Sequence, residues 1–537
     1  MNALHAYRLD VIPFLSDTLR SKFLERDPVF STTVKSVLCG LLTLLISEFT
    51  VGSLPHFDSL IDLACLIYTD NENLCVRFWE LDFPSPAKRS LLEYARSRFP
   101  LHFEPFLRLL TALSSSSEAA NYAYDYLSRL ETFTIAETEG HEHFTKNGDS
   151  YVKALPHSSR DLFISHEIRR RLKLITGTIG RVLSFPKEPL VVLWHVDPYS
   201  AIDFFFASLE AFFQSPDPSH PGTFPFLPQR GVANSSVPSI MNLVTSILPL
   251  MSALFSSPRV AQDLAAFGGL LIKQVFGVIK RVSLVPSASV TIITSALDLI
   301  TRLCPLYRSE AWFHFRQSGL VSDISGHQST GVTNQRGGLM QYILSTVERP
   351  RGTYPVTVSF LNLVSTLLRC VQDEAQQESL ASVPMDTMPT SPTTTAFSGT
   401  QRSFQSSFSL VQRPASTPFN KSPAAELQTE VLLSFLSYIQ IDIFQAYDNW
   451  RYAKISERFR IGTLTLEIFD SILVATSKAI LTQEPTSSRV MESLQRFLYS
   501  KFLADSNSMY HLLPFFNVIG LGSDTIDASA HFHFGSH

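Results

Sequence analysis

Two histidines, His141 and His143, flank Glu142 in a short polar segment and form a candidate pair of metal ligands. A zinc site needs three or four convergent ligands, and no third ligand follows at a recognisable spacing. The segment around the pair has the polar, turn-forming composition of a surface loop. We therefore predict a solvated loop at residues 141–143 and no metal site.

Two glycine-containing segments resemble fragments of catalytic loops. Residues 177–180 (GTIG) lack the Gly-Lys-Ser/Thr that completes a phosphate-binding loop, and their context predicts strand, turn and strand. Residues 325–331, with Gly337-Gly338 beyond them, lack the Gly-x-Ser-x-Gly elbow that presents a nucleophilic serine. Neither segment brings a nucleophile and a base together. We therefore predict no catalytic and no cofactor-binding residue in this chain.

One basic run occurs, at residues 168–173 (IRRRLK). Such a run can contact a membrane surface or an acidic partner. Its alternation with apolar residues favours instead the outer face of a strand. Three Ser/Thr-Pro pairs follow later, at Ser391, Thr417 and Ser422. They leave two interpretations open: phosphorylation that switches a mobile tether, or a consequence of local composition.

The overall composition narrows the classes of function. The 537 residues carry 44 basic and 48 acidic side chains, a net charge of −4, which argues against direct nucleic-acid binding because phosphate contacts need a basic excess. The five cysteines lie mostly among apolar residues and predict buried thiols in a reducing compartment. No signal peptide is visible. Residues 239–257 are uncharged and long enough to span a membrane, but their polar residues favour a buried helix, so we predict no transmembrane segment.

Helical periodicity runs through most of the chain. Large apolar residues recur at i, i+3, i+4 and i+7, which predicts helices with one buried face. Three such sets are Phe57, Leu60, Ile61, Ala64 and Tyr68; Phe103, Phe106, Leu107 and Leu110; and Phe360, Leu363, Val364, Leu367 and Leu368. Helices joined by short proline- or serine-marked turns are typical of α-solenoids. We therefore predict a mostly α fold, an extended α-solenoid of HEAT- or ARM-like helix pairs.

The pattern changes in the segment 131–198, where β-branched residues increase and turns come close together. Residues 171–194 contain three short strand patterns, separated by a glycine turn at 176–180 and a proline-marked turn at 186–189. Short strands with tight turns predict a small SH3-like β-barrel inserted into the helical array. Trp194 fits the interior of such a barrel better than a peptide-binding groove.

Periodicity ends again after residue 373, where serine, threonine, proline and glutamine replace the apolar residues. Such a composition cannot bury enough surface to offset the entropy of ordering, and it predicts disorder. The predicted order of segments is a helical solenoid at 1–130, the SH3-like insertion at 131–198, a second helical solenoid at 199–373, a disordered linker at 374–425 and a truncated helical solenoid at 426–537.

Several stretches of the sequence resemble one family. Residues 77–80 (RFWE) and 98–110 (RFPLHFEPFLRLL) are similar to the large α-solenoid nucleoporins of the inner ring of the nuclear pore, and among these to the one-eighty-eight type. Residues 177–200 resemble the SH3-like insertion of that type. Residues 354–361 and 450–462 resemble its later helical stretches. The similar stretches follow in order across most of the chain.

The resemblance implies a non-enzymatic structural constituent of the nuclear pore complex, located in the nucleus at the nuclear envelope and supporting transport of protein and mRNA. It implies other inner-ring nucleoporins as partners, including a linker nucleoporin that binds a C-terminal tail absent here, with transport factors as further candidates. Family members are several times longer, so we expect an internal part of one. The alternative is a karyopherin-like or HEAT-type adaptor that binds protein cargo. Acidic rows on the inner helices would favour it, and here acidic residues are dispersed.

Overall fold

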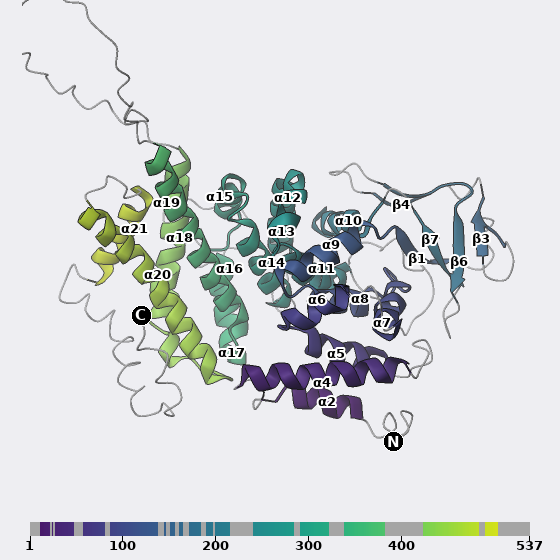
Figure 1. Cartoon of the computed structure of the whole chain (residues 1–537). Helices are drawn as coiled ribbons and strands as arrows, with labels where there is room; N and C mark the ends of the chain where they lie inside the picture. The colour runs from purple at the N-terminus through teal and green to yellow at the C-terminus, as the bar shows by residue number, and fades with distance from the viewer. Residues whose placement is uncertain are drawn as a thin grey trace, which may run out of the picture. The chain divides into compact units, whose positions relative to one another are not determined.

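The structure is a computed structural model of the 537-residue chain (Figure 1). It describes residues 11–21, 24, 27–47, 57–80, 86–137, 144–146, 151–155, 160–164, 171–183, 190–196, 199–214, 240–283, 290–321, 338–381, 423–482 and 489–502. The packing of its elements divides the chain into two units. The first unit is Met1–Leu320 with Gly331–Leu363, and the second is Val321–Thr330 with Val364–His537.

Helices make up most of the first unit, as the sequence predicts. They are α2 (Val11–Leu19), α4 (Pro28–Ser47), α5 (Phe57–Tyr68), α6 (Glu72–Glu80), α7 (Pro86–Arg96), α8 (Phe103–Leu113), α9 (Ser117–Ser128), α10 (Ala201–Gln214), α11 (Ile240–Leu254), α12 (Pro258–Asp263), α13 (Gly268–Val282), α14 (Val290–Leu303), α15 (Arg308–Gln317), α16 (Gly338–Ile343) and α17 (Arg349–Arg351). A short 3-10 helix, η3 (Ala265–Phe267), and a π-helix, η5 (Leu344–Glu348), join some of them.

The helices of the first unit pack in two rows. In the first row, α2 packs on α5, α5 on α8, α8 on α11 and α11 on α14. In the second row, α6 packs on α9, α9 on α10, α10 on α13 and α13 on α15. Each helix therefore covers the apolar face of its neighbour in the row, and the core continues from one helix pair to the next. This packing agrees with the predicted α-solenoid.

The predicted periodic faces are buried. The four apolar positions of α8 and the five of α18 (Pro355–Ala381) are at most 4% exposed. In α5 the same holds for every predicted position except Phe57, which is half-buried at the first residue of the helix. Local signals also fix helix starts. Ser200 and Asp203 form a reciprocal capping box at the start of α10, in which the backbone N–H of Ser200 donates to Asp203 Oδ2 over 2.9 Å.

A buried glutamate determines how α18 begins. Glu348 is 1% exposed and lies at the end of η5, just before the chain reverses at Gly352, which has a φ of 71°. The carboxylate accepts the backbone N–H of Val356 over 2.7 Å, the backbone N–H of Thr357 over 3.3 Å and the Thr357 hydroxyl over 2.5 Å. These donors are among the groups that a helix N-terminus leaves unpaired. Glu348 thus caps the following helix from the preceding one.

The β insertion contains seven described strands, four more than the sequence analysis predicts. They are β1 (Thr132–Glu137), β2 (Phe144–Lys146), β3 (Tyr151–Ala154), β4 (Arg160–Ile164), β5 (Arg171–Leu174), β6 (Ile179–Leu183) and β7 (Leu190–His195). Five form an antiparallel sheet in the order β1-β7-β6-β3-β2, and β4 pairs with β5 separately. The glycine turn at 176–180 therefore does not close a hairpin between β5 and β6, because β6 pairs with β3 and β7.

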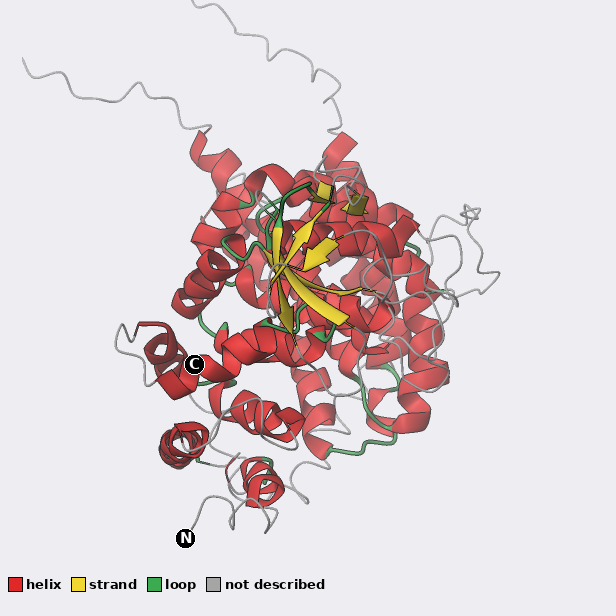
Figure 2. Ribbon diagram, turned by 90° about the vertical axis from the view of Figure 1, so that its right-hand side faces the viewer, coloured by secondary structure: helices red, strands yellow, loops and turns green. Residues whose placement is uncertain are grey.

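The sheet is attached to the helices through the start of β1 and the end of β7. Thr132 of β1 lies opposite His195 of β7, so the insertion leaves and re-enters the helical array at one place. The Thr134 N–H donates to the Phe99 carbonyl over 2.8 Å. The Phe99 ring, fully buried between α7 and α8, contacts Phe106, Phe133, Phe204 and Phe205 at centroid distances of 5.2 to 6.3 Å. Figure 2 shows the strands in front of the helical array.

The segment 239–257 forms a buried helix, as predicted. Eight of the fifteen residues of α11 are buried, and Pro249 lies inside the helix. Among the described residues, α4 is the one helix long and apolar enough to cross a membrane, with a mean hydropathy of 1.9 and 22% of the apolar window buried. This helix passes on length and composition only, so the absence of a transmembrane segment stays a prediction.

The second unit contains the rest of α18 together with α19 (Pro423–Tyr438), the π-helix η6 (Ile439–Phe444), the 3-10 helix η7 (Tyr447–Asn449), α20 (Ile455–Thr482) and α21 (Arg489–Phe502). Phe444, Phe469 and Phe502 meet edge to face at its core, with centroids 5.3 to 5.8 Å apart. Helix α18 continues to Ala381, into the predicted linker, because its polar residues are good helix formers. Residues 382–422 lie outside the described residues.

Candidate functional site

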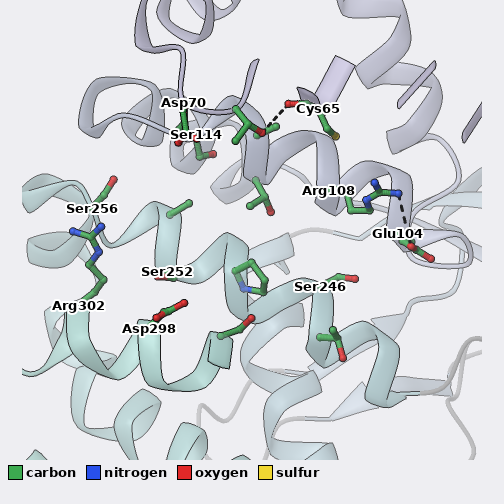
Figure 3. A pocket seen from close by; sticks show the side chains of 18 residues that line it. Cys65, Asp70, Glu104, Arg108, Ser114, Ser246, Ser252, Ser256, Asp298 and Arg302 are labelled. Carbon is green, nitrogen blue, oxygen red and sulfur yellow. Dashed lines mark hydrogen bonds and ion pairs between the residues drawn. The ribbon is translucent and has the colours of Figure 1, made fainter. Parts of the chain in front are cut away.

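A polar groove opens on the first helical row. Its cavity, of about 620 Å³, is shown in Figure 3 and lies between α5, α8, α11 and α14. The lining residues are Cys65, Thr69, Asp70, Glu104, Arg108, Thr111, Ala112, Ser114, Ser115, Thr245, Ser246, Pro249, Ser252, Ala253, Ser256, Ser295, Asp298 and Arg302. Most are small and hydroxyl-bearing or charged. We refer to this cavity as the polar groove.

Helical spacing explains why the lining is polar while the helices are buried. On α11, the positions 245, 249 and 252 recur at three- and four-residue intervals and so share one face, and position 256 follows two residues after the helix ends. The opposite face holds Leu243, Ile247, Leu250 and Leu254, each 0% exposed. The polar residues that make segment 239–257 a poor membrane span are largely those that line the groove. Its apolar residues form the core beneath it.

The helices of the row run in the same direction past the groove. In Figure 3, Glu104 of α8 and Ser246 of α11 lie on one side, whereas Ser114 and Ser256 lie on the other. The C-terminal ends of α8 and α11 therefore meet on the side where Arg302 lies. The last four carbonyls of α8 are already in use, because Leu110 and Thr111 accept from Ser114, Ala112 from Cys75 and Leu113 from Trp79.

Pro249 supplies one further acceptor. It has no N–H, so the carbonyl of Thr245, four residues earlier, receives no helical hydrogen bond from it. Thr245 and Pro249 both line the cavity, which places the freed carbonyl on the groove side of α11. Thr245 is half-buried at the groove, so the donor that this carbonyl lacks can come from water or from a ligand.

Many of the hydroxyls along the groove are used within their own helices. Thr69, Thr111 and Thr245 donate to carbonyls four residues earlier, at 2.7 to 2.8 Å. The side chains of Ser252 and Ser256 differ, because neither has a hydrogen-bond partner in the described part of the chain. Ser252 lies in the last turn of α11, and Ser256 lies two residues beyond its end. On the α11 side, the groove therefore has two hydroxyls that the described part of the fold does not use.

The charges of the groove are nearly balanced. Arg108 forms ion pairs with Asp62 and, at 4.0 Å, with Glu104, so its charge is compensated on its own side. Arg302, exposed on the opposite side, has no ion pair within the part of the chain that the structure describes. Asp70 and Asp298 are the other charged lining residues. Neither a strongly anionic nor a strongly cationic ligand is favoured.

The cysteine in the lining is a neutral thiol at physiological pH. Burial is the main cause, and it raises the pKa of Cys65 to about 12, although the nearby Arg108 acts in the opposite direction. A thiolate is the nucleophilic form, so Cys65 is not activated for covalent chemistry. The lining contains no histidine to serve as a base near neutral pH. The polar groove is thus equipped to form hydrogen bonds rather than to make or break covalent bonds.

A comparison with known protein families gives a clear match. The sequence model described as Nucleoporin Nup188, N-terminal subdomain III, matches residues 232–383 and 405–535, more than half of the chain. The chain belongs to the Nup188 nucleoporin family. The resemblance found in the sequence is therefore confirmed.

Curated relatives agree with the family match. Nucleoporin NUP188 of Homo sapiens is 22% identical over 533 residues, which cover 97% of this chain and 25% of the relative. Nucleoporin NUP188 of Mus musculus is 21% identical over 532 residues with the same coverage. Nucleoporin nup184 of Schizosaccharomyces pombe is 20% identical over 449 residues, covering 80% of this chain and 24% of the relative. The chain thus spans about a quarter of the length of these relatives.

The family match covers half of the polar groove. Helices α11 and α14 lie inside the matched residues, whereas α5 and α8 precede them. The groove is therefore assembled across the start of the matched subdomain. Its existence depends on the packing of α8 against α11, which are separated in sequence by the whole β insertion.

The structure does not bring the sequence candidates together in one site. Residues 141–143 and 325–331, and the start of the basic run, lie outside the described residues. Within 177–180, the Gly177 N–H donates to the Ala154 carbonyl over 2.8 Å and Gly177 has a φ of 92°, so this turn ties the end of β3 to the start of β6. Among the described residues, no group of three or more potential metal ligands occurs. The five cysteines are free thiols, and all but Cys65 are buried.

Sequence reasoning missed the groove, although one signal was present. Segment 240–256 places hydroxyls and a proline at helical intervals in an otherwise apolar helix. A buried helix with one small, polar face predicts a surface that another group approaches. The walls formed by α5 and α14, with the residues just after α5, give no such signal, because each contributes only three lining residues.

Proposed function

We propose that this chain is a structural segment of a nucleoporin, located at the nuclear pore complex of the nuclear envelope. The observation that carries the proposal is the family match over residues 232–383 and 405–535, together with relatives named nucleoporins that align with 97% of the chain. The finer assignment, to the inner ring and to support of nucleocytoplasmic transport, extends this proposal.

The packing of the first unit supports a non-enzymatic scaffold role. Two rows of helices share a continuous apolar core, which gives a long surface on a rigid base. The polar groove has hydrogen-bonding groups but no activated nucleophile. A protein built in this way acts through shape and surface. Other nucleoporins are then its expected partners, including a linker nucleoporin bound elsewhere in the full-length protein.

We propose in addition that the β insertion is SH3-like. Seven short strands between α9 and α10, most of them in one antiparallel sheet, support a small barrel-type module. Trp194 is fully buried, which favours a role in the interior of the module. The division into helical stretches at 1–130, 199–373 and 426–537 also stands as a proposal. Helix α18 ends at Ala381 and α19 begins at Pro423, so both helices extend into the segment 374–425.

One observation favours a second candidate function, that of a karyopherin-like adaptor for protein cargo. The polar groove lies on successive helices of one row, where adaptor solenoids bind extended segments of other proteins. The near balance of its charges argues against strongly charged cargo. This candidate predicts a soluble distribution in the cell, whereas the scaffold predicts a fixed one.

The test uses the full-length gene product tagged with a proximity-labelling enzyme and a fluorescent protein. The scaffold proposal expects a continuous fluorescent rim at the nuclear envelope and labelling of other nucleoporins above the level given by the free enzyme. Slow recovery after photobleaching is expected as well, because scaffold subunits exchange slowly. A diffuse signal that recovers quickly, with soluble cargo among the labelled proteins, would overturn the scaffold and favour the adaptor.

A further inference from the structure

The polar groove contains donors and acceptors that the fold does not use. The Ser252 and Ser256 hydroxyls and the Arg302 guanidinium have no partner in the described residues, and the Thr245 carbonyl lacks its helical donor. Thr245, Ser252 and Arg302 lie on two adjacent helices of the first row, α11 and α14, and Ser256 follows the end of α11. A ligand that satisfies them must offer both donors and acceptors within a short distance of each other.

The composition of the lining excludes several ligand classes. No aromatic residue lines the groove, so a nucleobase finds no stacking partner. A phosphate group needs convergent cations, but Arg108 is neutralised by Asp62 and lies on the opposite side from Arg302. A lipid chain needs an apolar lining, which the hydroxyls and carboxylates do not provide. The remaining common ligand with alternating donors and acceptors is a polypeptide backbone.

The dimensions fit an extended segment. Neighbouring helices pack about 8–10 Å apart, and an extended chain advances about 3.3 Å per residue. A segment that crosses from α8 over α11 to α14 therefore meets a new helix about every three residues. Small lining residues such as Ala112, Ala253 and Pro249 leave room for its backbone to approach.

We infer that the polar groove binds an extended, weakly charged segment of a partner polypeptide. The inference deepens the proposed function, since it gives a scaffold segment a site for a linear partner. It rests on the geometry of the groove and on the unused polar groups there. The Ser252 hydroxyl and the Thr245 carbonyl bind the backbone of the segment, and Arg302 binds one of its carbonyls.

The experiment selects a phage-displayed library of random peptides of about twelve residues, a length sufficient to cross the groove, on the purified 537-residue chain. The enriched sequences are then synthesised with a fluorescein label and titrated by anisotropy. Ser252→Tyr fills the groove and is expected to weaken binding at least about tenfold. Arg302→Ala, a surface change, is expected to weaken it about two- to tenfold, the effect of one lost hydrogen bond.

Thr291→Tyr is the matched control, because Thr291 is an exposed position of α14 outside the groove. It is expected to leave binding unchanged. Because the charges of the groove nearly cancel, raising the salt from about 50 to about 500 mM should change the affinity by less than about threefold. Peptides that bind wild type, Ser252→Tyr and Arg302→Ala equally would overturn the inference, as would a library with no enriched sequence. The envelope-rim experiment is independent of either result.

Discussion

The cap that Glu348 provides for α18 gives the sharpest test of the packing described above. The change is Glu348→Gln, which keeps the shape of the side chain and removes its charge. One oxygen remains to accept the N–H groups of Val356 and Thr357. The new amide nitrogen faces the Thr357 hydroxyl, which at present donates to the carboxylate. All three contacts then form as neutral hydrogen bonds, the one at Thr357 with the amide nitrogen donating to the hydroxyl, so each loses the assistance of a negative charge.

The expected loss follows from these contacts. A hydrogen bond to a charged group contributes about 1.5–3 kcal/mol, against about 0.5–1.5 kcal/mol for a neutral one, a difference of about 1 kcal/mol per bond. Three bonds give about 3 kcal/mol. Because Glu348 is 1% exposed, water does not compensate for the weakened bonds. A loss of this size increases the population of the state in which the first turns of α18 are open by about 150-fold.

Hydrogen–deuterium exchange read by mass spectrometry measures that opening. Peptides that cover the start of α18 should exchange about 150-fold faster in Glu348→Gln, while peptides from α5 should not change. Glu118→Gln is the control, because Glu118 occupies the exposed first turn of α9 and makes the same chemical change without buried partners. The reasoning is refuted if Glu348→Gln and Glu118→Gln give the same small effect.

Three further predictions follow from other positions. Gly180→Ala should destabilise the sheet by about 1–3 kcal/mol, because the new Cβ would lie 2.7 Å from Trp194 Cε3. Hydrogen–deuterium exchange of β6 and β7 should therefore become faster. Gly40→Ala is the control, because nothing lies within 4 Å of its new Cβ, and it should leave this exchange unchanged. Burial raises the pKa of Cys65 from 9.0 to about 12. The stability that the protonated Cys65 thiol contributes is therefore present below pH 9 and is lost as the pH rises towards 12. Between pH 9 and pH 12, iodoacetamide should modify this thiol more slowly in the native protein than in the unfolded protein. Ser200→Ala should lower the free energy of unfolding by about 1 kcal/mol and speed hydrogen–deuterium exchange at the start of α10. Ser200→Thr keeps a capping hydroxyl and should largely avoid both effects.

The helical part of the fold could be predicted because its signals are local. Periodic apolar residues marked the buried faces of α5, α8 and α18, and segment 239–257 was correctly interpreted as a buried helix rather than a membrane span. The end of α18 was placed too early. Its last residues are polar, and hydrophobic periodicity gives no information where a helix extends beyond the core that it packs against.

The strands and the groove depend on distant pairing, and local patterns did not identify them. β2 has three residues and β3 has four, too short for alternation to be distinguished from a loop. β5 and β6 were predicted correctly as strands, but their partners, β4 and β3, could not be inferred from the turn between them. The groove combines side chains more than two hundred positions apart, from Cys65 to Arg302, so only the packing of the row brings them together.

The attachment of the sheet has a mechanical consequence. Leu130 and Ala201, at the two ends of the insertion, are joined directly by a backbone hydrogen bond of 3.0 Å, and Thr132 lies opposite His195 just beyond it. Tension passing along the backbone from α9 to α10 would therefore load that bond first and then open β1 from β7 one rung at a time. A zipper of this kind yields at low force compared with strands pulled in shear. If the helical array is stretched, the sheet is expected to unravel early and add contour length, while the Phe99 cluster holds the helices on either side together.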